Sequence, residues 1–228
     1  MAILNGNVIG NIRGRLGNLS AHTVDGKTIL AARPSSFNIN NDPAVTQVRK
    51  KFSVTVALAQ AVLALATLAV VWKSVKESGM SVYNTIFKSN FHYSGTDKPT
   101  TDNIITPGGF SLPVSVAAVA ADKVTASLLA LNTESVFSAE EVNLSANVVV
   151  CFTDPTNPDD KPYQLISLSK EVANFDFTQA YDLQIDFDTK QKLIAAKYTK
   201  NILLLSIASK TADGKVAQYS ATSPKASA

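Results

Sequence analysis

The chain has 228 residues, of which 46% are hydrophobic, and a formal net charge of +3. This length accommodates one large or two small domains, and the apolar content is sufficient for a packed core, which excludes an intrinsically disordered chain. Cys151 is the only cysteine, so an internal disulfide and a cluster of thiolate metal ligands are also excluded.

The first seventeen residues carry glycines at spacings of four, four and three, at Gly6, Gly10, Gly14 and Gly17. Most residues between them are poor helix formers, so we expect an extended arm with bends that lies against a neighbouring subunit. The segment lacks the Lys-Ser/Thr pair of a phosphate-binding loop, and no strand precedes it as a dinucleotide site requires. It has neither a basic start nor an apolar run of signal-peptide length, and we expect no cleaved secretory signal.

A β-hairpin is predicted for residues 18–33, NLSAHTVDGKTILAAR. Asp25-Gly26 supplies the two positive-φ positions of a type I′ turn, and β-branched residues flank it. We interpret the lone His22 in the first strand as a packing or surface residue. Pro34 ends the second strand, and a polar loop follows.

One long helix is predicted for residues 44–77, a run of 34 residues with neither glycine nor proline. Asp42 and Pro43 form its expected start, and at 1.5 Å per residue it would extend roughly 50 Å, longer than a domain of this size. We therefore expect neighbouring copies to cover it. The apolar candidates for the subunit interface on this helix are Val54, Leu58, Leu65 and Trp72.

Residues 54–72 of this helix are apolar on nearly every face and have basic flanks. They meet the length rule for a membrane span, so a single transmembrane helix is an alternative. We favour burial in protein, because the frequent alanines are a weak membrane signal and suit close helix packing. A second, short helix is predicted for residues 81–90, with Gly79 ending the first helix, so that the two form an antiparallel pair.

Beyond residue 110 the periodicity changes from helical to two, which predicts short strands. The expected strands are 124–131, 147–152, 163–168, 174–178, 182–188, 192–198, 201–208 and 216–222. Their number and spacing indicate an antiparallel β-sandwich of immunoglobulin-like type. The predicted fold class is therefore α+β, with the extended arm, the β-hairpin and the helical pair before the sandwich. The predicted domains are residues 1–98 for the arm, hairpin and helices, 99–118 for a linker, 119–222 for the sandwich and 223–228 for a flexible tail.

Two acidic clusters are candidate metal-binding or catalytic sites. Asp154, Asp159 and Asp160 could offer oxygen ligands to calcium, but no closing glutamate follows at the spacing of a calcium loop, and we interpret them as turn residues. The strand 182–188, DLQIDFD, alternates apolar and acidic residues. We interpret its outward carboxylates as an exposed face or an edge guard and not as a glycosidase pair. The interface candidates on it are Asp182, Asp186 and Asp188.

Charge is distributed unevenly along the chain. Residues 1–98 carry eleven basic and four acidic residues, whereas residues 99–228 carry ten basic and fourteen acidic residues. Arginine pairs bidentately with carboxylates or phosphates. The expected partner of the arginines is the acidic half of a neighbouring copy, in a head-to-tail contact, with nucleic-acid phosphates as the alternative. An ordinary solvated surface is an equally open interpretation of these residues. The four arginine candidates are Arg13, Arg15, Arg33 and Arg49.

The first third of the chain resembles an uncharacterised protein family of Bacteroidota chromosomes and of phages that infect these bacteria. The matching residues, within positions 6 to about 90, are Gly10, Gly14, Gly17-Asn18, Gly26-Lys27, Arg33-Pro34, Gln47, Arg49 and Phe52. The resemblance implies a β-sandwich in the second half and a non-enzymatic part of a virion, and no catalytic residue carries over from it.

Together these observations predict a structural subunit of a bacteriophage virion or phage-like assembly, in the tail, the neck or the capsid, that assembles in the bacterial cytoplasm. The expected partners are copies of itself and other virion proteins, with no small-molecule substrate, no cofactor, no metal and no membrane. No catalytic residue is predicted. Two alternatives stay open: a surface adhesin or binding module whose sandwich loops recognise glycan or protein, and a single-span membrane protein.

Overall fold

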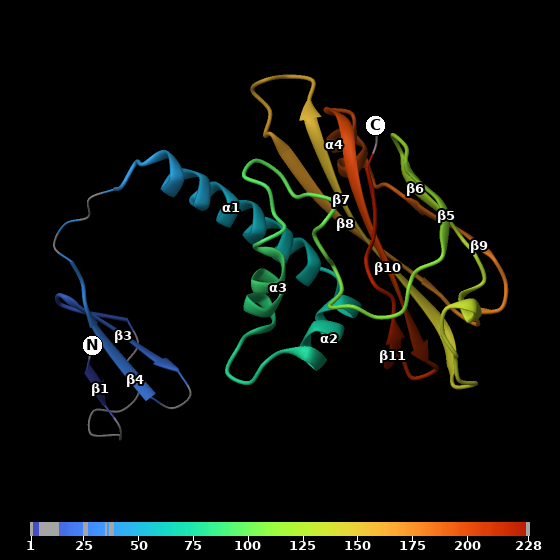
Figure 1. Cartoon of the computed structure of the whole chain (residues 1–228), viewed down its shortest axis with the longest axis horizontal. Helices are drawn as coiled ribbons and strands as arrows, with labels where there is room; N and C mark the ends of the chain where they lie inside the picture. The colour runs from blue at the N-terminus through green and yellow to red at the C-terminus, as the bar shows by residue number, and fades with distance from the viewer. Residues whose placement is uncertain (1, 5–13, 25–26, 35, 37–38, 227–228) are drawn as a thin grey trace. The chain divides into compact units, whose positions relative to one another are not determined.

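The structure is a computed structural model that describes residues 2–4, 14–24, 27–34, 36 and 39–226 (Figure 1). It divides into two compact units, Met1–Val45 and Thr46–Ala228, which we call the N-terminal unit and the main unit. The boundary expected within residues 99–118 is wrong. The helices before that segment and the strands after it share a hydrophobic core, so they belong to one unit.

The N-terminal unit is an antiparallel four-stranded sheet in the order β1-β4-β3-β2. Its strands are β1 (Ala2–Leu4), β2 (Gly14–Leu16), β3 (Leu19–Val24) and β4 (Lys27–Ala32). The predicted hairpin is confirmed as β3 and β4, whereas its turn residues Asp25 and Gly26 lie outside the described residues. The prediction of an extended arm is wrong for the described part of residues 1–17, because β1 pairs with β4 and β2 pairs with β3. Gly6 and Gly10 lie outside the described residues.

The predicted long helix is wrong, because it breaks into α1 (Pro43–Leu63) and α2 (Ala66–Val75), which are bent by 108°. Leu65 leaves the helical conformation at φ −91° and ψ 106°. The bend lets both helices place apolar residues on one sheet, and this burial outweighs the helix propensity of the residues at the break. The predicted short helix is confirmed as α3 (Val82–Asn90), with the Ser81 hydroxyl capping it at the Asn84 N–H.

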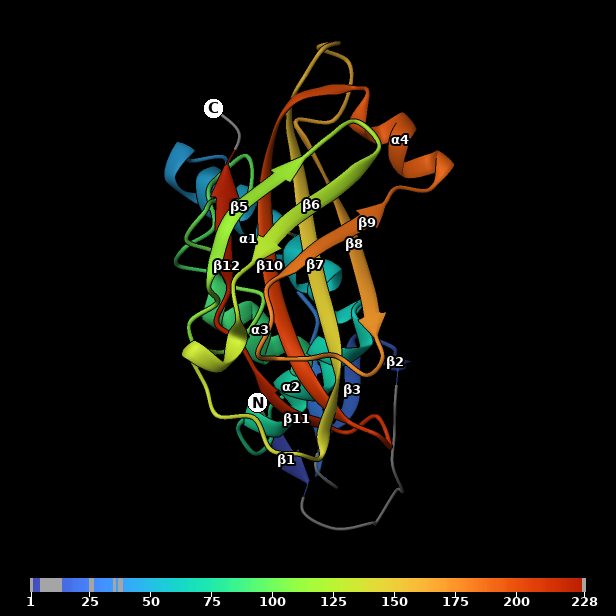
Figure 2. The ribbon, with the colours of Figure 1, turned by 90° about the vertical axis from the view of Figure 1, so that its right-hand side faces the viewer.

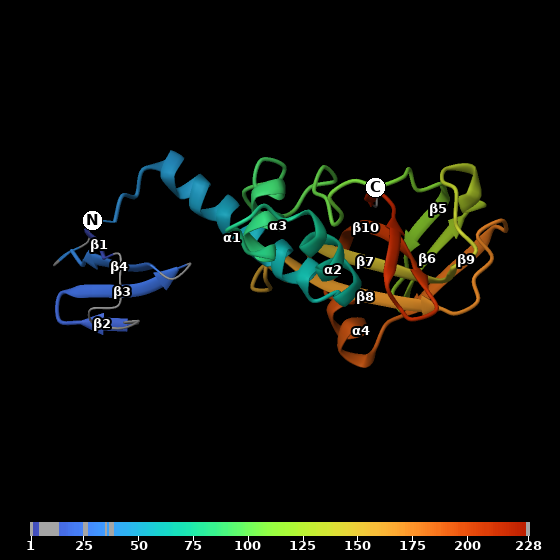
Figure 3. The ribbon, with the colours of Figure 1, turned by 90° about the horizontal axis from the view of Figure 1, so that it is seen from below.

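The main unit has three layers: the helices α1 to α3, a five-stranded sheet and a three-stranded sheet (Figure 3). The five-stranded sheet has the order β11-β10-β7-β8, with β12 also pairing with β10, and the other has the order β5-β6-β9. The strands of the larger sheet are β7 (Glu141–Pro155), β8 (Tyr163–Val172), β10 (Tyr198–Thr211), β11 (Val216–Tyr219) and β12 (Ser223–Ala226). Those of the smaller sheet are β5 (Val114–Val119), β6 (Lys123–Leu128) and β9 (Tyr181–Asp186).

The five-stranded sheet is buried on both of its faces. Along β7, Val148 and Val150 pack toward the three-stranded sheet, whereas Val149 and Cys151 pack against the helices. This two-sided burial explains the unbroken run of apolar residues in the strand. The α+β class and the two stacked antiparallel sheets are confirmed.

Several predicted boundaries in the second half need correction. Residues 192–197 are not a strand, because 192–195 belong to α4 (Thr189–Ala195), which starts with a capping box formed by Asp188 and Gln191, and β10 begins only at Tyr198. Residues 174–178 are a bend and a turn, and a short 3₁₀ helix, η1, spans Leu131–Thr133. The predicted flexible tail is wrong for Ser223–Ala226, which form β12, whereas residues 227 and 228 lie outside the described residues.

Candidate assembly surfaces

One face of the N-terminal sheet is apolar. Residues that are directly opposite in paired strands share a face, and the face alternates along each strand. Ala21 and Thr28 on this face are buried, whereas Leu19 and Leu30 are half-buried. No helix or second sheet belongs to this unit in the part of it that the structure describes. We call this the apolar face; its members are Leu19, Ala21, Thr23, Thr28, Leu30 and Ala32.

The opposite face of the same sheet is basic. Arg15, His22 and Lys27 are exposed, and none of the described residues of this unit forms an ion pair. The side chains of Ser20 and Ala31 are short, and no carboxylate occurs on the face among its described residues. We call this the basic face; its members are Arg15, Ser20, His22, Lys27, Ile29 and Ala31.

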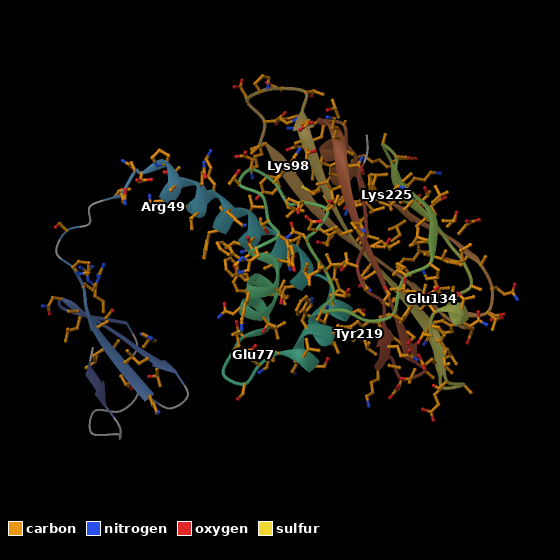
Figure 4. All side chains as sticks on the ribbon, in the orientation of Figure 1. Arg49, Glu77, Lys98, Glu134, Tyr219 and Lys225 are labelled. Carbon is orange, nitrogen blue, oxygen red and sulfur yellow. The ribbon has the colours of Figure 1, made fainter. Side chains whose placement is uncertain are left out.

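The arginine candidates that the structure describes belong to two different units. Arg15 lies on the basic face, and Arg33 directly follows β4, is exposed, and donates its N–H to the Asn18 carbonyl oxygen at 2.8 Å. Arg49 is exposed on α1 of the main unit (Figure 4). Arg13 lies outside the described residues.

The four apolar helix candidates are buried by their own chain, so the expectation that neighbouring copies cover them is wrong. Only 3%, 0%, 4% and 1% of their surfaces is exposed, at Val54, Leu58, Leu65 and Trp72 in that order. The bend between α1 and α2 makes this possible, because it turns the apolar stretch onto Val149, Ile202 and Leu204 of the sheet. Among the described residues no single helix is both long and apolar enough to cross a membrane. The bent pair of α1 and α2 together has the length and the apolar composition of a span, and these two properties are the only evidence for one.

The outer face of the three-stranded sheet is acidic. Asp182, Gln184 and Asp186 of β9 are exposed and alternate with buried residues, as the sequence pattern predicts. The Ser127 hydroxyl donates to Asp182 at 2.7 Å, and the Gln184 amide donates to Asp186 at 2.8 Å. We call this the acidic face; its other members are Val116, Ala118, Lys123, Thr125 and Ser127.

Asp188 has a different role from the other two aspartates. Its carboxylate accepts the Gln191 N–H at 2.7 Å, and the Gln191 side chain accepts the Asp188 N–H at 2.8 Å. This reciprocal pair caps the first turn of α4. The Asp188 carboxylate therefore caps a helix, and Asp188 is no longer a candidate for the subunit interface.

The acidic turn after β7 is neutralised by lysines. Lys98 and Lys200 both pair with Asp154 at 3.3 Å, and Lys197 pairs with Asp160 at 2.8 Å. Hydrogen bonds from Lys200 and Lys98 lower the pKa of Asp154. The described residues contain no group of three or more histidine, cysteine or acidic side chains arranged to hold a metal ion.

Glu141 is a buried carboxylate at the start of β7 that was not predicted from the sequence. Burial alone would raise the pKa of Glu141, but hydrogen bonds from Ser209, Ser138 and Gln218 outweigh it and lower the pKa. These bonds tie the loop before β7 to β10 and β11. The sequence signal is only a glutamate beside an apolar strand, so its buried partners could not be foreseen.

Cys151 is poorly suited to act as a nucleophile. Burial raises the pKa of the Cys151 thiol to about 12, so the reactive thiolate is not formed at neutral pH. His22 is exposed in the N-terminal unit, and His92 is exposed in the main unit.

Comparison with known proteins gives little guidance. No family model and no curated protein matches the chain. Two solved structures of β-glucosidase from Kluyveromyces marxianus, one in complex with glucose and one labelled with selenomethionine, are similar at 14% identity with TM-scores of 0.22 and 0.23. The matches cover 62% and 64% of this chain but only 17% and 18% of those chains. Superpositions at this level do not establish a shared fold.

Proposed function

We propose that the chain is a non-enzymatic structural subunit of a bacteriophage virion or phage-like assembly, which associates with copies of itself and with other virion proteins. The phage setting comes from the resemblance of residues 6 to about 90 to a family found in phages of Bacteroidota. The observation that carries the assembly role is the apolar face of the N-terminal sheet.

A sheet with one apolar face needs a second layer to bury it. Leu19 and Leu30 are only half-buried in the N-terminal unit, and complete burial of a leucine stabilises by about 1.5–3 kcal/mol. The described side chains of this face are uncharged, so the same face of a second copy can stack on it without repulsion. Two such sheets would pack roughly 10 Å apart, as in a β-sandwich.

The main unit is the part of the subunit that we assign to the particle surface. Its two cores fill both sides of the five-stranded sheet, and large apolar side chains such as Phe52, Leu129 and Val136 stay exposed on its surface. We assign its paired sheets to the immunoglobulin-like type. Burial raises the pKa of the Cys151 thiol to about 12, which argues against a catalytic role for this residue.

Electron microscopy of the purified full chain tests the proposal. We expect regular multi-copy particles from the unmodified protein and their loss in the variant Leu30→Asp, which places a charge on the apolar face. Val136→Asp is the matched control, because Val136 is an apolar residue that is 89% exposed elsewhere on the chain. Particles that form equally well from Leu30→Asp, or their absence from the unmodified protein, would contradict the proposal.

A further inference from the structure

The chain exposes two flat sheet faces of opposite charge. On the basic face, Arg15 and Lys27 carry positive charges and no described side chain carries a negative one. Ser20 and Ala31 continue the row of Arg15 across the sheet, and His22 and Ile29 form the next row, between Arg15 and Lys27.

The acidic face is the counterpart on the main unit, and Figure 2 views the molecule from its side. Asp182 and Asp186 project from it, and none of the described residues forms an ion pair with either carboxylate. Lys123 lies opposite Asp186 on β6, and the Lys170 ammonium of β8 donates to the Gln184 carbonyl oxygen of β9 at 2.9 Å. The exposed Asp122 in the turn before β6 adds to Asp182 and Asp186, so the three carboxylates still outnumber these two lysines. The central side chains of the face, Thr125 and Ser127, are short.

We propose that the basic face of one copy docks on the acidic face of a second copy, sheet against sheet, with Arg15 and Lys27 opposite Asp182 and Asp186. Guanidinium and ammonium groups only donate hydrogen bonds, and carboxylates only accept them. Each face can therefore form ion pairs and hydrogen bonds with the other face that it does not form within its own unit. Complementary charge also fixes which faces meet, because two basic or two acidic faces repel one another.

This contact deepens the proposed function, on which it rests, by naming a second interface. The two faces differ, so the contact is heterologous and propagates from copy to copy into a ring or a filament. The apolar face, by contrast, pairs with itself and joins only two copies. A particle with many copies therefore needs the heterologous contact, and the apolar face joins its copies in pairs.

Charge reversal on each face tests the contact in the full-length chain. One variant carries Asp182→Lys with Asp186→Lys, and the other carries Arg15→Glu with Lys27→Glu. Matched controls reverse two exposed charges outside both faces, as Glu134→Lys with Glu140→Lys and as Lys73→Glu with Lys76→Glu. Circular dichroism verifies the fold of every variant, and light scattering measures the mass of the assembly.

We expect each face variant alone to fall below the assembly mass of the unmodified protein, with association weakened at least about tenfold by like charges. An equimolar mixture of the two variants should regain that mass, because the remaining Arg15 and Lys27 meet the remaining Asp182 and Asp186, and the reversed pair also matches. The controls should keep the original mass.

The possible failures are distinguishable. Face variants that each assemble as the unmodified protein does would overturn this contact and leave the proposed function standing. Variants that stay small even when mixed would also overturn it, because the charges would then act within one chain. An unmodified protein that is itself a monomer would overturn the proposed function together with the contact.

Discussion

The indole Nε1 of Trp72 donates a hydrogen bond of 2.9 Å to the backbone carbonyl oxygen of Ile105. Both residues are buried, and the bond fastens α2 to the segment that leads into the three-stranded sheet. That segment was predicted to be a linker, and the bond is one physical reason why the helices and sheets form a single unit.

Trp72→Phe tests this attachment. Phenylalanine keeps most of the apolar contact but leaves the buried Ile105 carbonyl oxygen without its donor, so we expect a loss of about 1–3 kcal/mol in the free energy of unfolding. Urea denaturation measures the change. Val70→Ala on the exposed side of α2 should shift stability by less than about 0.5 kcal/mol, and an equal loss in both variants would contradict the role of the bond.

Asn90 at the end of α3 offers a second test. Its side chain donates to the Ile86 and Ile104 carbonyl oxygens and accepts the Ile104 N–H at 2.8 Å. Asn90→Ala removes these bonds from a fully buried site, and we expect a loss of roughly 2–4 kcal/mol. Asn84→Ala at an exposed position of the same helix is the control in the same denaturation experiment. A loss below that of the control would rule out this role.

Ser206 and Ser209 lie on the same strand and are both buried, but their hydroxyls differ. The Ser206 hydroxyl has no partner among the described residues, whereas the Ser209 hydroxyl donates to Glu141 and accepts the Gln218 N–H at 3.1 Å. Ser206→Ala should therefore change the unfolding free energy by less than about 0.5 kcal/mol or increase it, whereas Ser209→Ala should lower it by about 1–3 kcal/mol. The opposite order would refute this assignment.

Glu141 makes stability depend on pH. Its pKa in the folded chain is lowered from the ordinary value of 4.5, so its contribution to stability is present above pH 4.5 and is lost as the pH falls through the folded pKa. Glu141→Gln should therefore flatten the acid side of the stability profile relative to the unmodified chain. Unfolding curves between neutral and acidic pH measure this slope. An unchanged slope in Glu141→Gln, matching the exposed control Glu140→Gln, would contradict the prediction.

Elements with strong local signals were predictable from sequence. The hairpin of β3 and β4 and the helix α3, with its Ser81 cap, were both foreseen. Asp188 and Gln191 have the spacing of a capping box, but residues 192–198 were predicted as a strand and this helix start was missed. The break at Leu65 was not predictable, because no glycine or proline marks it in the sequence. It is determined by the sheet on which both helices pack.

The candidate surfaces were only partly predictable. The alternation along β9 predicts the exposed positions of Asp182 and Asp186. The separation of the N-terminal sheet into an apolar and a basic face depends on the pairing of β2 with β3, and the glycines around β2 suggested an arm and not a strand. Whether these faces meet other copies stays a prediction.

The molar mass of the full chain in solution, measured by light scattering at micromolar concentration and physiological salt, tests the assembly role most directly. The apolar face, over which the described residues of its own unit place no second layer, predicts a species of two or more copies of the 24.2 kDa chain. A single well-behaved species of 24.2 kDa under these conditions would contradict it.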